Sequence, residues 1–199
     1  MLDFRLYAVS NRTLAPDLVR FVCDASAGGL KVLQLREKDL STQELLALAM
    51  SIREAAPALK LIINDRPDIA ESCGAVGVHA SEEGWPAERL RENFPNLLIG
   101  RSIHSATRET QGLDYVTFGP VFATPSKSAL GIGPRGLAAL RQAVELSSVP
   151  LFAIGGMTPE RARECRGRGA HGIAVMSDLL QATDVAARLA EYKEALGEL

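Results

Sequence analysis

Eight short apolar runs recur along the chain, and helical or turn-rich segments separate them. Short apolar runs bounded by turn residues are typical of buried strands. Parallel neighbouring strands need a crossover connection, so strands that alternate with helices indicate a parallel sheet. The expected strands are Leu6–Val9, Val32–Arg36, Leu61–Ile63, Val76–His79, Leu98–Gly100, Tyr115–Phe118, Leu151–Ile154 and Gly172–Val175.

Eight repeats favour a closed α/β barrel, the (βα)8 TIM barrel, over an open doubly wound sheet. Open sheets usually have fewer repeats and a Gly-rich dinucleotide turn after the first strand, and no such turn follows Val9. We expect a single domain over residues 1–199, because this length leaves no room for a second one. Helical spacing predicts helices over 15–27, from Ser41 to about Pro57, and over 136–146.

The composition is that of an ordinary soluble globular protein, with 47% hydrophobic residues and a formal charge of −2. This near balance of charge gives no long-range attraction to nucleic acid or anionic lipid. No segment is long and apolar enough to cross a bilayer, and residues 1–5 lack the features of a signal peptide. We therefore expect a cytoplasmic protein.

The cysteines and histidines form no recognisable metal-binding or disulfide pattern. There is no C-x-x-C pair, so we expect reduced, packed thiols, and the histidines lack the spacing of metal ligands. These residues are Cys23, Cys73, Cys165, His79, His104 and His171.

The active site of such a barrel lies at the carboxyl ends of the strands, where the second strand carries basic residues. Leu33 and Leu35 suit the helix-facing side, which places Gln34, Arg36 and Lys38 toward the barrel axis and its mouth. Two cations on one edge repel each other and lose hydration unless an anion meets them. The side chains therefore predict an anion site at the mouth.

A structural alternative is that Arg36 and Lys38 are neutralised by the acids beside them. Glu37 and Asp39 alternate with the two cations in the sequence. Buried charges in proteins are usually paired, so an internal ion pair is the simplest competing interpretation.

The third and fifth strands also end in polar residues. Asp65, after Asn64, could hold Mg²⁺ through hard oxygen ligands, or it could pair with Arg66 or Arg36. Ser102 has the parity of Gly100 and is expected to face the mouth. His104 is a candidate proton carrier, although a single histidine here is more often a packed or helix-capping residue.

The loops after the seventh and eighth strands predict a phosphate site. They contain Gly155, Gly156 and, after the eighth strand, Met176 and Ser177. Such loops usually cradle phosphate in a barrel, with backbone N–H groups at a helix start directed at the anion. Paired glycines let the backbone approach closely, and Thr158-Pro159 is a favourable helix opening.

The longest loop follows the sixth strand and contains Thr124, Ser126 and Lys127. It can close N–H groups, hydroxyls and one cation over an anion, and the alternative is a plain surface excursion. No nucleophile is paired with a base anywhere in this set. The two anion cradles together predict a protein that binds two phosphorylated small molecules side by side.

With these residues in place, the chain resembles the thiamine phosphate synthase family and the related thiazole phosphate tautomerases, from Tyr7 to Leu180. The motifs that carry the resemblance are Gln34-Leu35-Arg36-Glu37-Lys38, Asn64-Asp65-Arg66, Gly77-Val78-His79, the run from Gly119 to Lys127, Ile154-Gly155-Gly156-Met157-Thr158 and Ala174-Val175-Met176-Ser177.

The resemblance implies an enzyme that joins hydroxymethylpyrimidine diphosphate to thiazole phosphate and releases pyrophosphate. The family reaction is dissociative: pyrophosphate leaves, a pyrimidine methyl cation forms, and the thiazole nitrogen captures it. The implied pyrimidine diphosphate residues are Gln34, Arg36, Lys38, Asn64, Ser102 and Lys127, with Arg36, Ser102 and Lys127 as the catalytic ones. The implied thiazole phosphate residues are Thr124, Ser126, Gly155, Gly156, Met176 and Ser177.

The resemblance also implies Mg²⁺ as the cofactor, with Asp65 as one ligand. Synthases carry a second Mg²⁺-binding Asp after the fourth strand, and that position falls here on Gly84. Glu82 or Glu83 could replace the missing ligand, and we expect Glu83.

Two other functions stay open at this stage. One is a thiazole tautomerase with His104 as proton carrier, although Pro120 stands where one form of that enzyme has its histidine. The other is a non-catalytic barrel that binds thiazole or thiamine phosphate. The expected partners are small-molecule substrates rather than nucleic acid or membrane, and a homodimer is an open alternative to a monomer.

Overall fold

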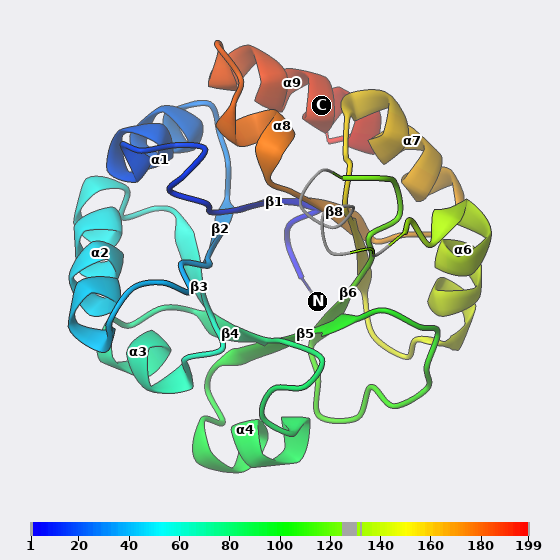
Figure 1. The fold of residues 1–199 in the computed structure, drawn as a ribbon, viewed down its shortest axis with the longest axis horizontal. Coiled ribbons are helices and arrows are strands. Elements are labelled where there is room, and N and C mark those ends of the chain that lie inside the picture. The colour runs from blue at the N-terminus through cyan, green and yellow to red at the C-terminus, as the bar shows by residue number, and fades with distance from the viewer. Residues whose placement is uncertain (1, 125–130, 132, 199) are drawn as a thin grey trace.

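Eight parallel strands form a closed barrel in the order of the sequence, β1 to β8 (Figure 1). The structure is a computed structural model, and it describes residues 2–124, 131 and 133–198. The α/β TIM barrel expected from the repeats is thereby confirmed. The strands are β1 Leu6–Val9, β2 Val32–Leu35, β3 Lys60–Asn64, β4 Gly77–Ala80, β5 Leu98–Ile103, β6 Tyr115–Phe118, β7 Leu151–Ile154 and β8 Gly172–Val175.

Helices surround the barrel, one after most of the strands (Figure 1). The capping box predicted at Ser41 is present, because its Oγ accepts from the Glu44 backbone N–H and the Glu44 carboxylate accepts from the Ser41 N–H. The first helix begins later than expected, at Leu18, where the Asp17 side chain caps it. The helices are α1 Leu18–Ala27, α2 Thr42–Ala55, α3 Pro67–Ser72, α4 Ala87–Asn93, α6 Gly136–Leu146, α7 Pro159–Gly167, α8 Ser177–Leu180 and α9 Val185–Leu196.

Alternation along the strands builds two apolar cores, one inside the barrel and one between the barrel and its helices. Leu33 and Leu35 belong to the outer core, as their parity predicted, while Gln34 points inward and is buried. The inner core consists of Phe4, Tyr7, Val9, Val32, Ile62, Tyr115, Phe152 and Ala174.

Two strands differ in length from the expectation. β2 ends at Leu35, so Arg36 is the first residue beyond the strand rather than its last. β5 continues to Ile103 because Ser102 pairs with Thr117 and Ile103 with Phe118 on β6. Ser102 is therefore fixed by the sheet itself.

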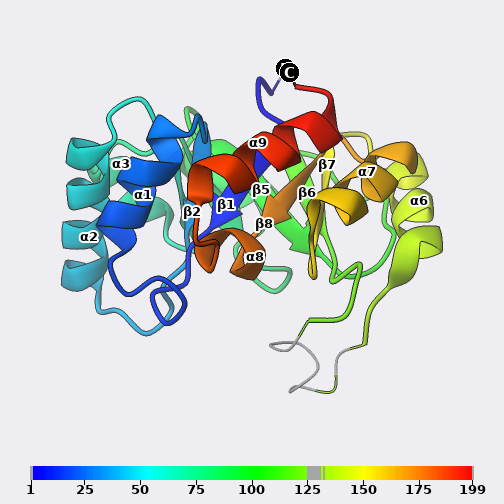
Figure 2. The same ribbon diagram turned by 90° about the horizontal axis from the view of Figure 1, so that it is seen from above.

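Figure 2 shows the chain before β1 and the end of α9 at the same end of the barrel. Because all strands are parallel, the loops that follow them lie at the opposite end, where the candidate residues gather. Within the described residues, no helix is both long enough and apolar enough to span a membrane. All three cysteines are free thiols, and Cys73 and Cys165 are buried.

Closure between β8 and β1 depends on a glycine. The Ile173 N–H donates to the Arg5 carbonyl at 2.7 Å, and a Cβ on the adjacent Gly172 would overlap that same carbonyl oxygen. Gly172→Ala should lower the free energy of unfolding by about 1–3 kcal/mol, the usual cost of overpacking. Urea denaturation followed by circular dichroism measures the change.

Gly167 at the end of α7 is the matched control for this prediction. A Cβ there meets nothing within 4 Å, and its φ is not positive. Gly167→Ala should therefore be neutral or stabilise by up to about 1 kcal/mol through the helix preference of alanine. Equal loss in both variants would contradict the assignment of Gly172 to the barrel seam.

Candidate active site

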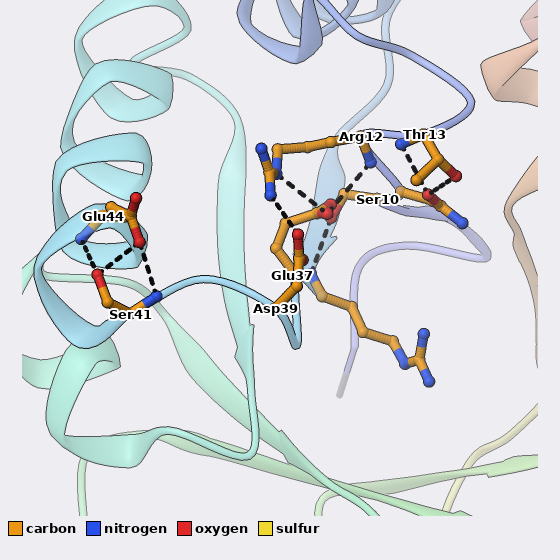
Figure 3. A network of polar contacts seen from close by, with 9 residues as sticks. Ser10, Arg12, Thr13, Glu37, Asp39, Ser41 and Glu44 are labelled. Atoms are coloured by element: carbon orange, nitrogen blue, oxygen red, sulfur yellow. Dashed lines mark hydrogen bonds and ion pairs between the residues drawn. The ribbon is translucent and has the colours of Figure 1, made fainter.

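A buried carboxylate ties the loop after β1 to the loop after β2 (Figure 3). Glu37 is only 8% exposed, and its Oε1 accepts from the Ser10 hydroxyl at 2.5 Å. Its Oε2 accepts from the Arg12 backbone N–H at 3.1 Å, and the Arg12 Nε lies 3.4 Å from it. Arg12 also pairs with Asp39, with Nη2 2.7 Å from Oδ2. Both acids beside the second-strand cations thus form their ion pairs with Arg12.

Arg36 and Lys38 are consequently left without an acidic partner among the described residues. Arg36 is half-buried and Lys38 is exposed. The backbone N–H of Arg36 donates to Ser10 Oγ at 2.8 Å, which fixes the chain at this position. The alternative that Glu37 or Asp39 neutralises the two cations is wrong, and their positive charge stays available to a ligand.

A hollow of about 370 Å³ lies between the two loops. Arg36 and Lys38 both line this hollow. The hollow is lined by Asn11, Arg12, Thr13, Arg36, Glu37, Lys38 and Asp39.

Two side-chain amides inside the mouth are hydrogen-bonded in series to a carboxylate. The Gln34 Nε2 donates to Asn64 Oδ1 at 2.7 Å, and the Asn64 Nδ2 donates to Asp65 Oδ2 at 2.8 Å. Asp65 Oδ1 accepts from the Ser81 backbone N–H at 2.6 Å. The backbone of Asp65 has a φ of 57°, a left-handed conformation that is uncommon outside glycine and is a frequent sign of a functional position. These bonds hold the carboxylate in one orientation.

Asp65 forms no ion pair with Arg66 or Arg36. Arg66 pairs instead with Asp68, at 2.6 Å between Nη2 and Oδ2. Each Asp65 oxygen accepts one hydrogen bond, which leaves lone pairs for a further ligand. The described residues hold no cluster of three or more His, Cys, Asp or Glu side chains suited to a metal. The spare lone pairs of Asp65 suit an ion that takes few protein oxygens and keeps waters, as Mg²⁺ does.

The two glutamates after β4 differ in their contacts. Glu82 binds His104 twice, with Oε2 2.8 Å from the ring Nδ1 and Oε1 accepting from the backbone N–H at 3.1 Å. Glu83 is exposed and has no ion-pair partner among the described residues. Of the two acids considered as a replacement for the missing metal ligand, Glu83 is the one with a free carboxylate.

A buried polar network on β4, β5 and β6 was missed by the sequence reasoning. The His79 ring bonds the Tyr115 hydroxyl through Nδ1 at 3.1 Å and Ser102 Oγ through Nε2 at 3.0 Å. Thr117 Oγ1 lies 3.3 Å from both His79 Nε2 and Ser102 Oγ. Burial lowers the pKa of His79 to about 4, while the charge of Asp65 raises it and that of Arg36 lowers it. The ring is therefore neutral at physiological pH, and the inward parity of these positions was the available signal.

The backbone conformation and close packing of the loop after β7 require its two glycines. Gly155 has a φ of 100° and Gly156 a φ of 63°. A Cβ on Gly155 would lie 2.6 Å from the Pro120 Cα, and one on Gly156 would lie 2.7 Å from the Ala123 carbonyl oxygen. The two residues thus pack against the loop after β6. This packing explains them without a bound anion.

The residues after β8 begin a short helix. Met176 precedes α8, and the N–H groups of Leu180 and Gln181 bond the Met176 and Ser177 carbonyls at 3.0 Å. The N–H groups of the first turn, at Ser177 and the following residues, have no carbonyl to bond within the helix. As expected, Thr158 caps α7 through its Oγ1.

The long loop after β6 is only partly described. Thr124 is the last described residue before the gap. Ser126 and Lys127, expected at the thiazole and diphosphate sites, lie outside the described residues.

The chain is similar to known proteins over nearly its whole length. A family model described as thiamine monophosphate synthase matches residues 6–179. The putative thiamine-phosphate synthase of Geobacter sulfurreducens is 42% identical, over 92% of this chain and 89% of that protein. The thiamine-phosphate synthase of Chloroflexus aurantiacus is 38% identical, over 94% and 90%.

Among solved structures, the thiamine phosphate pyrophosphorylase of Pyrococcus furiosus superposes with a TM-score of 0.86 at 33% identity. That match covers 98% of this chain and 96% of the other. The sequence and structural matches agree with each other and with the residues at the mouth of the barrel, and the chain belongs to the thiamine monophosphate synthase family.

Proposed function

We propose that the protein is a transferase of thiamine biosynthesis that joins hydroxymethylpyrimidine diphosphate to thiazole phosphate and releases pyrophosphate. The observation that carries the proposal is the pair of cations Arg36 and Lys38, which have no acidic partner among the described residues and lie at the mouth of the barrel. Relatives named thiamine-phosphate synthase, at 42% and 38% identity, support the same activity.

The proposed diphosphate site consists of Arg36, Lys38, Gln34, Asn64 and Ser102. A dissociative reaction needs stabilisation of the leaving pyrophosphate and positioning of the two substrates rather than a strong base. Two cations supply the stabilisation because they can form charge-assisted hydrogen bonds with phosphate oxygens. The amides of Gln34 and Asn64 already hold each other in place, so little ordering is needed when substrate binds.

Mg²⁺ is the proposed cofactor, with Asp65 and Glu83 as its protein ligands. The fixed orientation and spare lone pairs of Asp65 support this choice, as does the carboxylate of Glu83, which forms no ion pair with any described residue. When bound, the ion would neutralise part of the charge on the diphosphate.

The proposed thiazole phosphate site consists of Gly155 and Gly156 after β7 and Met176 and Ser177 after β8. The first-turn N–H groups of α8, which have no carbonyl to bond within the helix, support it, because such groups attract phosphate. Thr124 and Ser126 are proposed to contact the thiazole, and Lys127 to act on the diphosphate from the same loop.

A second candidate function, thiazole tautomerase, is favoured by the Glu82–His104 pair. A carboxylate that binds the Nδ1 of an imidazole fixes its orientation and leaves Nε2 to exchange protons. His104 would then move the proton on the thiazole. The free cations argue for the synthase, because a tautomerase has no need of a diphosphate site.

Removal of one free cation tests the diphosphate site. Arg36→Ala should lower the turnover to thiamine phosphate at least about tenfold, because it removes a charge-assisted contact. Arg20→Ala is the control, since the side chain of this arginine is 80% exposed on α1 and, among the described residues, forms an ion pair with Asp24 alone. Calorimetric titration with pyrimidine diphosphate should show weaker binding to Arg36→Ala alone, and unchanged affinity would refute the site.

Lys127→Ala tests the part of the site that lies beyond the described residues. If Lys127 closes on the diphosphate, turnover should fall at least about tenfold while the free energy of unfolding stays the same. Activity assays and urea denaturation on the same preparation separate the two effects. Full turnover in this variant would show that Lys127 does not contribute to the reaction.

The two glutamates distinguish a synthase from a tautomerase. Glu83→Gln should raise the Mg²⁺ concentration needed for half-maximal thiamine phosphate synthesis, because it removes a negatively charged ligand. Glu82→Gln is the isosteric control and should leave that concentration unchanged. A tautomerase predicts the reverse, with proton exchange on the thiazole lost in Glu82→Gln and His104→Ala and intact in Glu83→Gln.

A further inference from the structure

We propose that Tyr115 and His79 are positioning residues that orient the Ser102 hydroxyl, so that its proton points out of the barrel toward an anion at the mouth. The anion would be a phosphate oxygen of the diphosphate, and in this respect the inference rests on the proposed function. Neither Tyr115 nor His79 needs to touch the substrate.

The sheet places the four side chains in two adjacent rows. His79, Gly100 and Tyr115 are register partners across β4, β5 and β6. One step toward the mouth, Ser102 on β5 pairs with Thr117 on β6. The His79 ring spans the rows, because its two nitrogens bond the Tyr115 hydroxyl and Ser102 Oγ.

Gly100 makes this arrangement possible. A Cβ at this position would overlap the ring of Tyr115 and lie 2.5 Å from its hydroxyl oxygen. The absence of a side chain thus lets the phenol cross beneath β5 to reach His79. A glycine inside a strand weakens the strand, so its presence here has a specific structural reason.

The tautomer of His79 follows from the proton of Tyr115. The Tyr115 hydroxyl is fully buried, and among the described residues its hydrogen-bond partner is His79 Nδ1. The other buried hydroxyl of the inner core, on Tyr7, makes no hydrogen bond to any described residue, so it does not accept the Tyr115 proton. Donation from Tyr115 to Nδ1 is the favoured direction, because it pairs the phenol proton with an acceptor 3.1 Å away, and an unpaired buried donor costs about 1–3 kcal/mol. Nδ1 is then the unprotonated nitrogen, and the neutral ring carries its proton on Nε2.

The orientation of Ser102 follows from that tautomer. The Nε2–H donates to Ser102 Oγ at 3.0 Å, and the Thr117 hydroxyl donates to the same oxygen from 3.3 Å. With both lone pairs engaged, Ser102 keeps its own proton for a further acceptor. None of the described residues supplies that acceptor, and the half-buried serine stands at the mouth end of β5.

The opposite tautomer would have the reverse effect. A proton on Nδ1 would point at the Tyr115 oxygen, and the phenol proton would then have no acceptor. Nε2 would then attract the Ser102 proton into the barrel, leaving an oxygen lone pair toward the mouth. A lone pair repels a phosphate oxygen, so the tautomer decides whether Ser102 can bind the diphosphate.

Nitrogen-15 NMR of the histidine side chains in the unliganded protein at neutral pH decides the tautomer. His79→Gln identifies the resonances of His79 by their loss. We expect Nδ1 to have the shift of an unprotonated nitrogen and Nε2 that of a protonated one. A proton on Nδ1 would overturn the inference, and this result does not depend on enzymatic activity.

Pyrophosphate with Mg²⁺ is the ligand probe for the positioning role. Tyr115→Phe should weaken pyrophosphate binding about tenfold, because His79 is then free to change tautomer and withdraw the Ser102 proton. Tyr7→Phe is the matched control, since it removes a buried hydroxyl from the same core without a hydrogen bond, and its affinity should stay at the parent value. In the Tyr115→Phe background, Ser102→Ala should add little further loss, because the two changes act on one contact.

Equal affinity of Tyr115→Phe and Tyr7→Phe for pyrophosphate would overturn the positioning role. Failure of the parent protein to bind pyrophosphate would instead refute the proposed function. The NMR result would still decide the tautomer in that case, so the two failures are distinguishable.

Discussion

The ion pair between Arg12 and the buried Glu37 determines which charges at the mouth of the barrel are neutralised within the protein. Glu37 could have neutralised its neighbours in the sequence, and the pairing with Arg12 and Ser10 prevents this. Two donors, the Ser10 hydroxyl and the Arg12 backbone N–H, bond the buried carboxylate, and the Arg12 guanidinium beside it offsets part of its desolvation. The same contacts join the loops after β1 and β2, while Arg36 and Lys38 have no acidic partner in the part of the chain that the structure describes.

The inside of the barrel changes from apolar to polar along its axis. The inner core of aromatic and aliphatic residues fills the barrel interior, and Gln34, His79, Ser102 and Thr117 add polar side chains toward the carboxyl ends of β2, β4, β5 and β6. Each of these four forms side-chain hydrogen bonds with its neighbours, which is the condition for keeping polar groups in a low-dielectric interior. A ligand at the mouth therefore meets groups whose orientations are already fixed, and it does not have to order them on binding.

The sequence predicts the features that depend on local patterns. It does not predict the contacts between residues that are far apart in the chain. Strand alternation places Gln34 correctly, and the capping box at Ser41 is visible in four residues. No local pattern shows that Arg12 would pair with Glu37, or that His104 would bind Glu82 rather than cap a helix. Such pairings arise only when the closed barrel brings successive loops together. The Tyr115–His79 contact is harder still to foresee, because it crosses a strand and depends on the empty space at Gly100.

Gly156 illustrates why a residue type that suits a function need not exist for that function alone. A glycine after the seventh strand predicts close approach of the backbone to a phosphate, and the left-handed φ and the nearby Ala123 carbonyl oxygen already exclude a side chain there. Arg161 adds a further constraint, because its Nη1 donates to the Gly156 carbonyl at 2.6 Å while its guanidinium lies 4.8 Å from the centre of the Phe122 ring. A bulky substitution at Gly156 would thus disturb the loop after β6 whether or not an anion binds. The proposed phosphate site is better probed from α8, because its first-turn N–H groups have no partner within the helix.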